Sequence, residues 1–140
     1  MNHVVSCTKK DLMSFTASVD NHQLILDQSI DLNGNDEGPR PKPLLLAALA
    51  GCSGMDVISI LEKMRVDYDN FTVITDGELT EEHPKYYHKI HLTYQFKGKN
   101  LPKDKIEKAI NLSLDRYCGV YAMLKKAANI TFEIKIEDPL

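Results

Sequence analysis

The chain has 140 residues, 43% of them apolar, which is enough for one domain with a single core. Lysine and arginine total 17 against 20 aspartate and glutamate residues, and the formal charge of -3 is spread along the chain. No basic patch indicates a nucleic-acid partner, so we expect none, and we expect a single domain over residues 1–140.

The first predicted elements are three strands. Residues 11–19 alternate between two faces, which is typical of a half-buried strand. A turn at Asp20 and Asn21 leads to a second strand at 23–27, so the two are expected to form a hairpin. Residues 4–7 are predicted to add a short strand before them.

A long helix is predicted next. Residues 33–39 are dense in turn-forming residues and indicate a loop. The helix is expected to begin after this loop and to reach about Arg65, with Pro41 and Pro43 in its first turn, where an unpaired backbone donor costs nothing. Its N-terminal half is apolar all round the axis, which predicts burial on every side.

Two strands follow, at 70–79 and 86–96, joined by a polar connection. The second of them has one apolar face, made of Ile90, Leu92, Tyr94 and Phe96. A second helix is expected after Leu101, and its spacing predicts burial of Ile106, Ile110, Leu114 and Tyr117.

The remaining elements are a short helical piece at 120–127 and a terminal strand in which Ile130, Phe132, Ile134 and Ile136 alternate with polar residues. The order is therefore three strands, a helix, two strands, two helices and a strand. We predict the α+β class, with antiparallel strands (three N-terminal, two central and one C-terminal) packed around the long helix.

The location expected from the sequence is cytoplasmic. Residues 1–13 lack the order of a secretory signal, and the longest apolar run, 44–50, is too short to span a bilayer, so no membrane partner is expected. In a reducing compartment the three cysteines do not form a structural disulfide framework. Each is then a buried filler, a metal ligand or a redox thiol.

Two cysteines lie where a thiol could react. Cys52 sits inside the predicted long helix beside Gly51 and near Gly54, and each glycine costs about 1 kcal/mol relative to alanine, so close packing or access to the sulfur is the expected compensation. Cys118 lies at a helix break, where backbone donors could stabilise a thiolate. The pair could react with a hydroperoxide as peroxidatic and resolving thiols, or both could be core filler, as we expect of Cys7.

Other candidate ligands are weaker. His83, His88 and His91 follow no known zinc spacing, so we expect no metal site and no cofactor, although His88 shares the apolar face of its strand and is a weak candidate for lining a pocket. Asp56, four residues after Cys52, falls on the same helical face. It either hydrogen-bonds near the thiol or has a structural role, and a carboxylate there raises the pKa of a thiol.

Two segments that contain these cysteines resemble the OsmC/Ohr family, whose name joins osmotically inducible protein C with the organic hydroperoxide resistance protein. Residues 38–41 lead into the stretch LLLAALAGCSGMDVI, and residues 116–124 read RYCGVYAML. Glu82-His83-Pro84 lies between them. The resemblance covers nearly the whole chain and is strongest from about Asn35 to Ile136.

The resemblance implies an intertwined homodimer with the long helix at its centre and active sites at the subunit interface. By the family pattern Cys52 is the peroxidatic thiol and Cys118 the resolving thiol. The substrates implied are organic hydroperoxides, which are reduced to alcohols with electrons from a dithiol donor.

The chain departs from the family at one feature. In the active peroxidases a carboxylate at the start of the long helix holds an arginine that stabilises the peroxidatic thiolate, but here the matching positions are Lys42 and Pro43. Arg40 and Arg116 are weak candidates for a substitute. Two functions are left open: a thiol peroxidase of reduced activity, or a binding protein for an apolar small molecule at the dimer interface.

Overall fold

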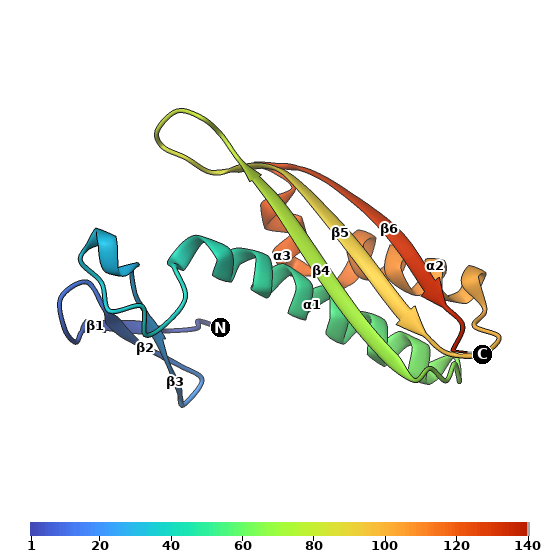
Figure 1. The fold of residues 1–140 in the computed structure, drawn as a ribbon. Coiled ribbons are helices and arrows are strands. Elements are labelled where there is room, and N and C mark those ends of the chain that lie inside the picture. The colour runs from blue at the N-terminus through green and yellow to red at the C-terminus, as the bar shows by residue number, and fades with distance from the viewer. Residues whose placement is uncertain (140) are drawn as a thin grey trace. The chain divides into compact units, whose positions relative to one another are not determined.

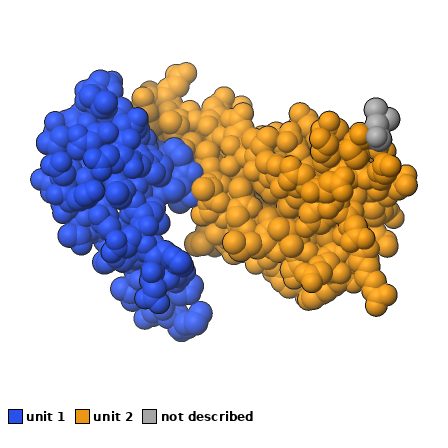
Figure 2. Space-filling model, turned by 60° about the horizontal axis from the view of Figure 1, so that its bottom comes forward, with its two compact units in different colours: residues 1–45 blue, residues 46–140 orange. Residues whose placement is uncertain are grey.

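A computed structural model describes residues 1–139 of the chain. Two compact units, Met1–Leu45 and Leu46–Leu140, can be distinguished, and Leu140 lies outside the described residues (Figure 2). The single domain expected over residues 1–140 stays a prediction.

The first unit contains a small antiparallel sheet with the strand order β1-β2-β3 (Figure 1). Its strands are β1 (Ser6–Lys9), β2 (Phe15–Val19) and β3 (His22–Leu26), so the three predicted N-terminal strands are confirmed. β2 is shorter than expected because residues 11–14 form a turn. There Ser14 Oγ donates a hydrogen bond to the carbonyl oxygen of Asp11 at 2.8 Å and accepts one from its amide at 3.1 Å.

The loop after β3 is ordered around one carboxylate, that of Asp27, which is 3% exposed. Its oxygens accept hydrogen bonds from the backbone amides of Gln28 at 2.7 Å, Glu37 at 3.1 Å and Asn35 at 3.2 Å. Burial by itself raises the pKa of Asp27, but the three amides and the charge of Arg40 together outweigh it, so the pKa lies below its ordinary value. The loop predicted at 33–39 is thus held by hydrogen bonds to Asp27, and a short 3-10 helix, Ile30–Leu32, precedes it.

The long helix, α1 (Pro41–Lys63), has Pro41 and Pro43 in its first turn as predicted. Its buried side belongs to one face, made of Leu49, Ser53, Gly54, Val57 and Leu61. The burial on every side expected of its N-terminal half is wrong for the single chain, since Leu45 is 46% exposed and Ala47 and Ala48 are exposed as well. The sheet and the following helices of one chain cover only one side of a helix.

By length and composition alone, α1 as a whole is long and apolar enough to cross a membrane, even though its longest uninterrupted apolar run, 44–50, is short. In the most apolar 18-residue stretch of this helix, 28% is buried in the described structure. A core helix of a soluble protein passes the same test, so this property is weak evidence, and the absence of a membrane partner stays a prediction.

The second unit contains a sheet with the order β4-β5-β6. β4 (Asn70–Leu79) and β5 (Tyr87–Lys97) form the predicted antiparallel hairpin. β6 (Asn129–Glu137) pairs with β5 in parallel, so the antiparallel direction expected for the C-terminal strand is wrong. The reason is the helical crossover between β5 and β6, which returns the chain to the end of the sheet where β5 began (Figure 1).

This crossover consists of α2 (Lys103–Leu112), a π-helical turn (Ser113–Tyr117) and α3 (Gly119–Leu124). Ile106, Ile110 and Leu114 are buried as predicted, but Tyr117 is 60% exposed, so that part of the prediction is wrong. The amide of Cys118 donates to the carbonyl oxygen of Ser113 at 2.7 Å, five residues back. A π-helical turn contains one residue more than an α-helical turn, so the position that faces the core shifts by one residue, from Tyr117 to Cys118.

The core of the second unit lies between α1, α2 and one face of the sheet. Its most buried members include the predicted face of β5, and the largest are Leu49, Leu61, Ile90, Leu92, Tyr94, Phe96, Ile106 and Ile110. The α+β class is therefore confirmed. This core fixes the backbone of α1 and of the π-helical turn, which carry the cysteines.

Candidate functional site

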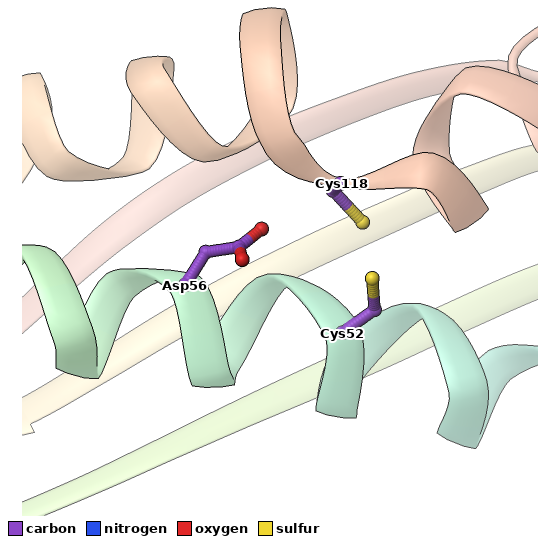
Figure 3. A group of neighbouring side chains, drawn as sticks. All are labelled: Cys52, Asp56 and Cys118. Atoms are coloured by element: carbon purple, nitrogen blue, oxygen red, sulfur yellow. The ribbon is translucent and has the colours of Figure 1, made fainter.

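Three side chains from α1 and from the start of α3 meet at one point (Figure 3). The sulfur atoms of Cys52 and Cys118 and a carboxylate oxygen of Asp56 all lie within 4.8 Å of one another. Cys52 and Asp56 are one helical turn apart on α1 and half-buried, whereas Cys118 is 3% exposed. The structure thus brings together the two cysteines that the sequence singled out, and it places the Asp56 carboxylate beside them.

Cys118 is held by the first turn of α3. It is the N-cap residue of that helix, and its sulfur accepts a hydrogen bond from the Tyr121 amide at 3.3 Å. Burial raises the pKa of the Cys118 thiol to about 11; the Tyr121 amide lowers it, and Cys52 and Asp56 raise it further. The predicted backbone donor is present, but burial outweighs it, so Cys118 is a neutral thiol at neutral pH.

The two glycines near Cys52 have different roles. A Cβ atom added at Gly51 would meet nothing within 4 Å, whereas one at Gly54 would lie 3.5 Å from Val73 Cγ2 of β4. Gly54 therefore belongs to the packing of α1 on the sheet, while the space next to Gly51 is open. Cys52 is the more accessible thiol of the pair, and Cys118 is the deeper one.

A chain of buried hydrogen bonds ends on the Asp56 carboxylate. Ser113 Oγ donates to Asp56 Oδ2 at 3.0 Å, Ser53 Oγ lies 2.9 Å from Ser113 Oγ, and the Tyr94 hydroxyl lies 2.7 Å from Ser53 Oγ. Because the single hydroxyl hydrogen of Ser113 goes to Asp56, Ser113 must accept from Ser53, and Ser53 must accept from Tyr94. The chain therefore has one direction and fixes the orientation of the Asp56 carboxylate.

Ser53, Ser113 and Tyr94 belong to the site but were not predicted from the sequence. One signal was available, because a tyrosine on the apolar face of a strand needs a partner for its hydroxyl when it is buried. The pKa of Tyr94 is raised to about 12, mainly by burial. The hydrogen bond with Ser53 lowers this pKa, whereas the charges of Cys118, Tyr121 and Asp56 raise it. The phenol is therefore a stable donor at neutral pH.

The arginines proposed as substitutes have other partners in the structure. Arg40 Nη1 lies 2.7 Å from Asp36 Oδ1 and 3.0 Å from the carbonyl oxygen of Gly38, so its described hydrogen bonds belong to the loop of the first unit. Arg116 is exposed on the π-helical turn, and its guanidinium carbon lies 6.0 Å from the centre of the Tyr117 ring. The contacts of the two arginines therefore do not support the expected role, which was to stabilise the Cys52 thiolate.

The remaining candidates lie outside the cluster. His88 Nε2 on β5 lies 2.8 Å from Glu78 Oε2 on β4, and His91 Nδ1 lies 2.7 Å from Thr131 Oγ1 on β6. Cys7 is exposed on β1, so its expected role as core filler is wrong. Within residues 1–139, one group of three Cys, His, Asp or Glu side chains is close enough to hold a metal ion, and it is the cluster of Cys52, Asp56 and Cys118.

Comparisons with known proteins identify one matching family and several similar proteins. The profile of the family described as OsmC-like protein matches residues 34–133. Protein YhfA of Escherichia coli is 36% identical over 119 residues, which are 85% of this chain and 86% of that protein.

Solved structures with the same fold include a hypothetical protein from Aquifex aeolicus, with a TM-score of 0.82, 29% identity and 98% of each chain covered. The organic hydroperoxide resistance protein OhrB of Bacillus subtilis has a TM-score of 0.68 at 13% identity, with 96% of this chain and 98% of that chain covered. At this identity the second likeness shows the fold alone.

Proposed function

Because the chain belongs to the family of OsmC-like proteins, we propose that it is a thiol-dependent peroxidase that reduces organic hydroperoxides to alcohols. The observation that carries the proposal is the approach of the Cys52 and Cys118 sulfur atoms to within 4.8 Å. A disulfide needs a sulfur–sulfur distance of about 2.05 Å, so the two sulfur atoms must move closer together for the bond to form.

In the first step the Cys52 sulfur attacks the distal oxygen of the hydroperoxide. The oxygen–oxygen bond breaks, the alkoxide takes up the proton lost by the thiol and leaves as an alcohol, and Cys52 becomes a sulfenic acid. In the second step the Cys118 sulfur attacks the Cys52 sulfur, water leaves with the Cys118 proton, and a disulfide forms. A dithiol donor then supplies two electrons and two protons by exchange.

The order of the two thiols follows from their surroundings. Cys52 is the more accessible sulfur, so it suits the attack on a bulky peroxide. Cys118 is buried beside Cys52, so its position suits the later, intramolecular step, and its raised pKa slows that step. Since a carboxylate and not a guanidinium lies beside the sulfurs, we expect slower turnover than in family members with the arginine–carboxylate pair.

Mass spectrometry of the thiols tests this proposal. The reduced protein is treated with one equivalent of cumene hydroperoxide, trapped with an alkylating reagent and digested. We expect a Cys52 to Cys118 disulfide and an alkylated Cys7. Both Cys52 and Cys118 recovered as unmodified thiols would contradict the peroxidase proposal.

The same measurement separates a second candidate function, the binding of an apolar small molecule with both cysteines as lining. The raised pKa of Cys118 and the neighbouring carboxylate favour this alternative, because both reduce thiol reactivity. Unmodified thiols together with a bound apolar ligand would support it.

We further propose a homodimer in a reducing compartment such as the cytoplasm. Met55 and Ile58 are exposed on α1, and exposed apolar surface on a helix of this length is typical of an interface between subunits. Sedimentation velocity should give a mass of two chains. A monomer at micromolar concentration would contradict this part of the proposal.

A further inference from the structure

We propose that the reduced protein binds one soft divalent cation of the zinc class between Cys52, Asp56 and Cys118. The inference does not depend on peroxide reduction, because it concerns the reduced thiols as ligands. Four observations carry it: the spacing of the three side chains, their charges, the hydrogen bonds behind them and the partial exposure of two of them.

The spacing is close to that of a zinc site. Zinc lies about 2.3 Å from a thiolate sulfur and about 2.1 Å from a carboxylate oxygen, so tetrahedral ligands lie roughly 3.5–3.8 Å apart. The three ligand atoms here lie within 4.8 Å of one another. Cys52 and Asp56 come from successive turns of one helix and Cys118 from another element, so the three side chains reach the same point from two parts of the backbone.

The charges of the cluster also favour a cation. Two ionisable thiols and a carboxylate meet in a partly buried place, and each anion disfavours the next. A divalent cation reverses it, because a coordinated thiol loses its proton and the carboxylate then becomes favourable. Peroxide chemistry gives the Asp56 carboxylate no comparable role.

The hydrogen bonds behind the cluster match the outer shell of a metal site. Ser113 occupies Asp56 Oδ2, which leaves Oδ1 for a metal ion, and the bonds through Ser53 to Tyr94 hold this arrangement. The Tyr121 amide donates to the Cys118 sulfur, and this bond persists when the sulfur is a thiolate. Outer-shell donors of this kind orient ligands and contribute to metal affinity.

The front of the cluster is accessible. Two of the three ligand residues, Cys52 and Asp56, are half-buried, so the cluster is not sealed from solvent on their side. Three protein ligands with water or a solute as the fourth are the usual arrangement of an open zinc site. Oxidation of Cys52 and Cys118 to a disulfide removes two of the three ligands, so the cation binds the reduced state only.

The experiment is a titration of the reduced full chain with cadmium, which gives a sulfur-to-metal charge-transfer band in the ultraviolet. We expect one cadmium per chain, displacement of cadmium by zinc, and no band for the disulfide form. Cys7→Ser should bind like the wild type. Cys52→Ser and Cys118→Ser should each weaken binding by at least about 100-fold, since each removes a ligand.

The carboxylate ligand is tested with a matched pair on α1. Asp56→Asn should weaken cadmium binding by at least about 10-fold, while Glu62→Gln, which removes a charge from an exposed position of the same helix, should leave it unchanged. Ser113→Ala keeps all three ligands and should also weaken binding, by about 10-fold.

Folding is checked by circular dichroism, and zinc should raise the Tm of the wild type and of Cys7→Ser but not that of Cys52→Ser. The proposal is overturned by a wild type that gives no band at one equivalent, by a Cys52→Ser band equal to that of the wild type, or by equal affinities of Asp56→Asn and Glu62→Gln. If the protein binds cadmium but does not reduce cumene hydroperoxide, the result contradicts the proposed peroxidase activity and supports the cation site.

Discussion

The two units of the chain are stabilised in different ways. Within residues 1–45, all of which the structure describes, Ala17 is the one buried apolar side chain, and the loop is ordered by hydrogen bonds to Asp27. The second unit has a continuous apolar core and a buried polar chain that ends on Asp56. Chemistry that needs fixed distances therefore belongs to the second unit, where packing holds both backbones.

The cysteines follow the same division. Cys7 is exposed on a strand of the first unit, whereas Cys52 and Cys118 meet in the second. Several large apolar side chains of the first unit are also exposed, among them Val4, Met13, Phe15 and Ile30. Such a unit gains stability from a covering surface, in line with the proposed homodimer.

The largest expected effect concerns activity. Cys52→Ser should reduce the rate of cumene hydroperoxide reduction with dithiothreitol by at least about 100-fold, because the nucleophile is lost. Cys7→Ser should leave the rate unchanged. If the two variants reduced the peroxide at equal rates, the second unit would not carry the activity as proposed.

The second prediction compares apolar packing. Leu61 is 0% and Leu32 59% exposed. Leu61→Ala should lower the free energy of unfolding by about 2–5 kcal/mol, through lost burial and the cavity left behind. Leu32→Ala should change it by less than about 0.5 kcal/mol. Urea unfolding measures both values, and similar losses for the two variants would contradict the exposed position of Leu32.

A third, smaller effect is expected for the polar chain. Tyr94→Phe removes the donor to Ser53 inside the core, so the free energy of unfolding should fall by about 1–2 kcal/mol. Tyr86→Phe, at a position 50% exposed, is the matched control and should have little effect. Denaturant unfolding of the two variants compares them, and an unchanged Tyr94→Phe would mean that the chain adds no stability.

The smallest effect concerns pH in the first unit. Because the folded-state pKa of Asp27 lies below its unfolded value, its stabilisation is present above the unfolded pKa, about 4, and is lost as the pH falls through the folded pKa. The Tm difference between wild type and Asp27→Asn should therefore be largest near neutral pH and shrink in acid. Asp20→Asn, in an exposed turn, is the control. A Tm difference independent of pH would contradict the assignment.

Local patterns in the sequence predicted most elements of the fold. Alternation of apolar and polar residues predicted β5 and β6, and the arrangement of apolar residues predicted α1 and α2, because side-chain periodicity depends on each element alone. The segments around Cys52 and Cys118 indicated the family, and the position of Asp56 on the helical face of Cys52 was visible from a separation of four residues.

The tertiary structure alone decided how these elements meet. The direction of β6 depends on the path of the crossover, and the exchange of Tyr117 for Cys118 at the core depends on a hydrogen bond across five residues. The chain from Tyr94 to Asp56 joins three elements. Periodicity carries no information about such contacts, because they arise when the faces of distant elements pack against one another.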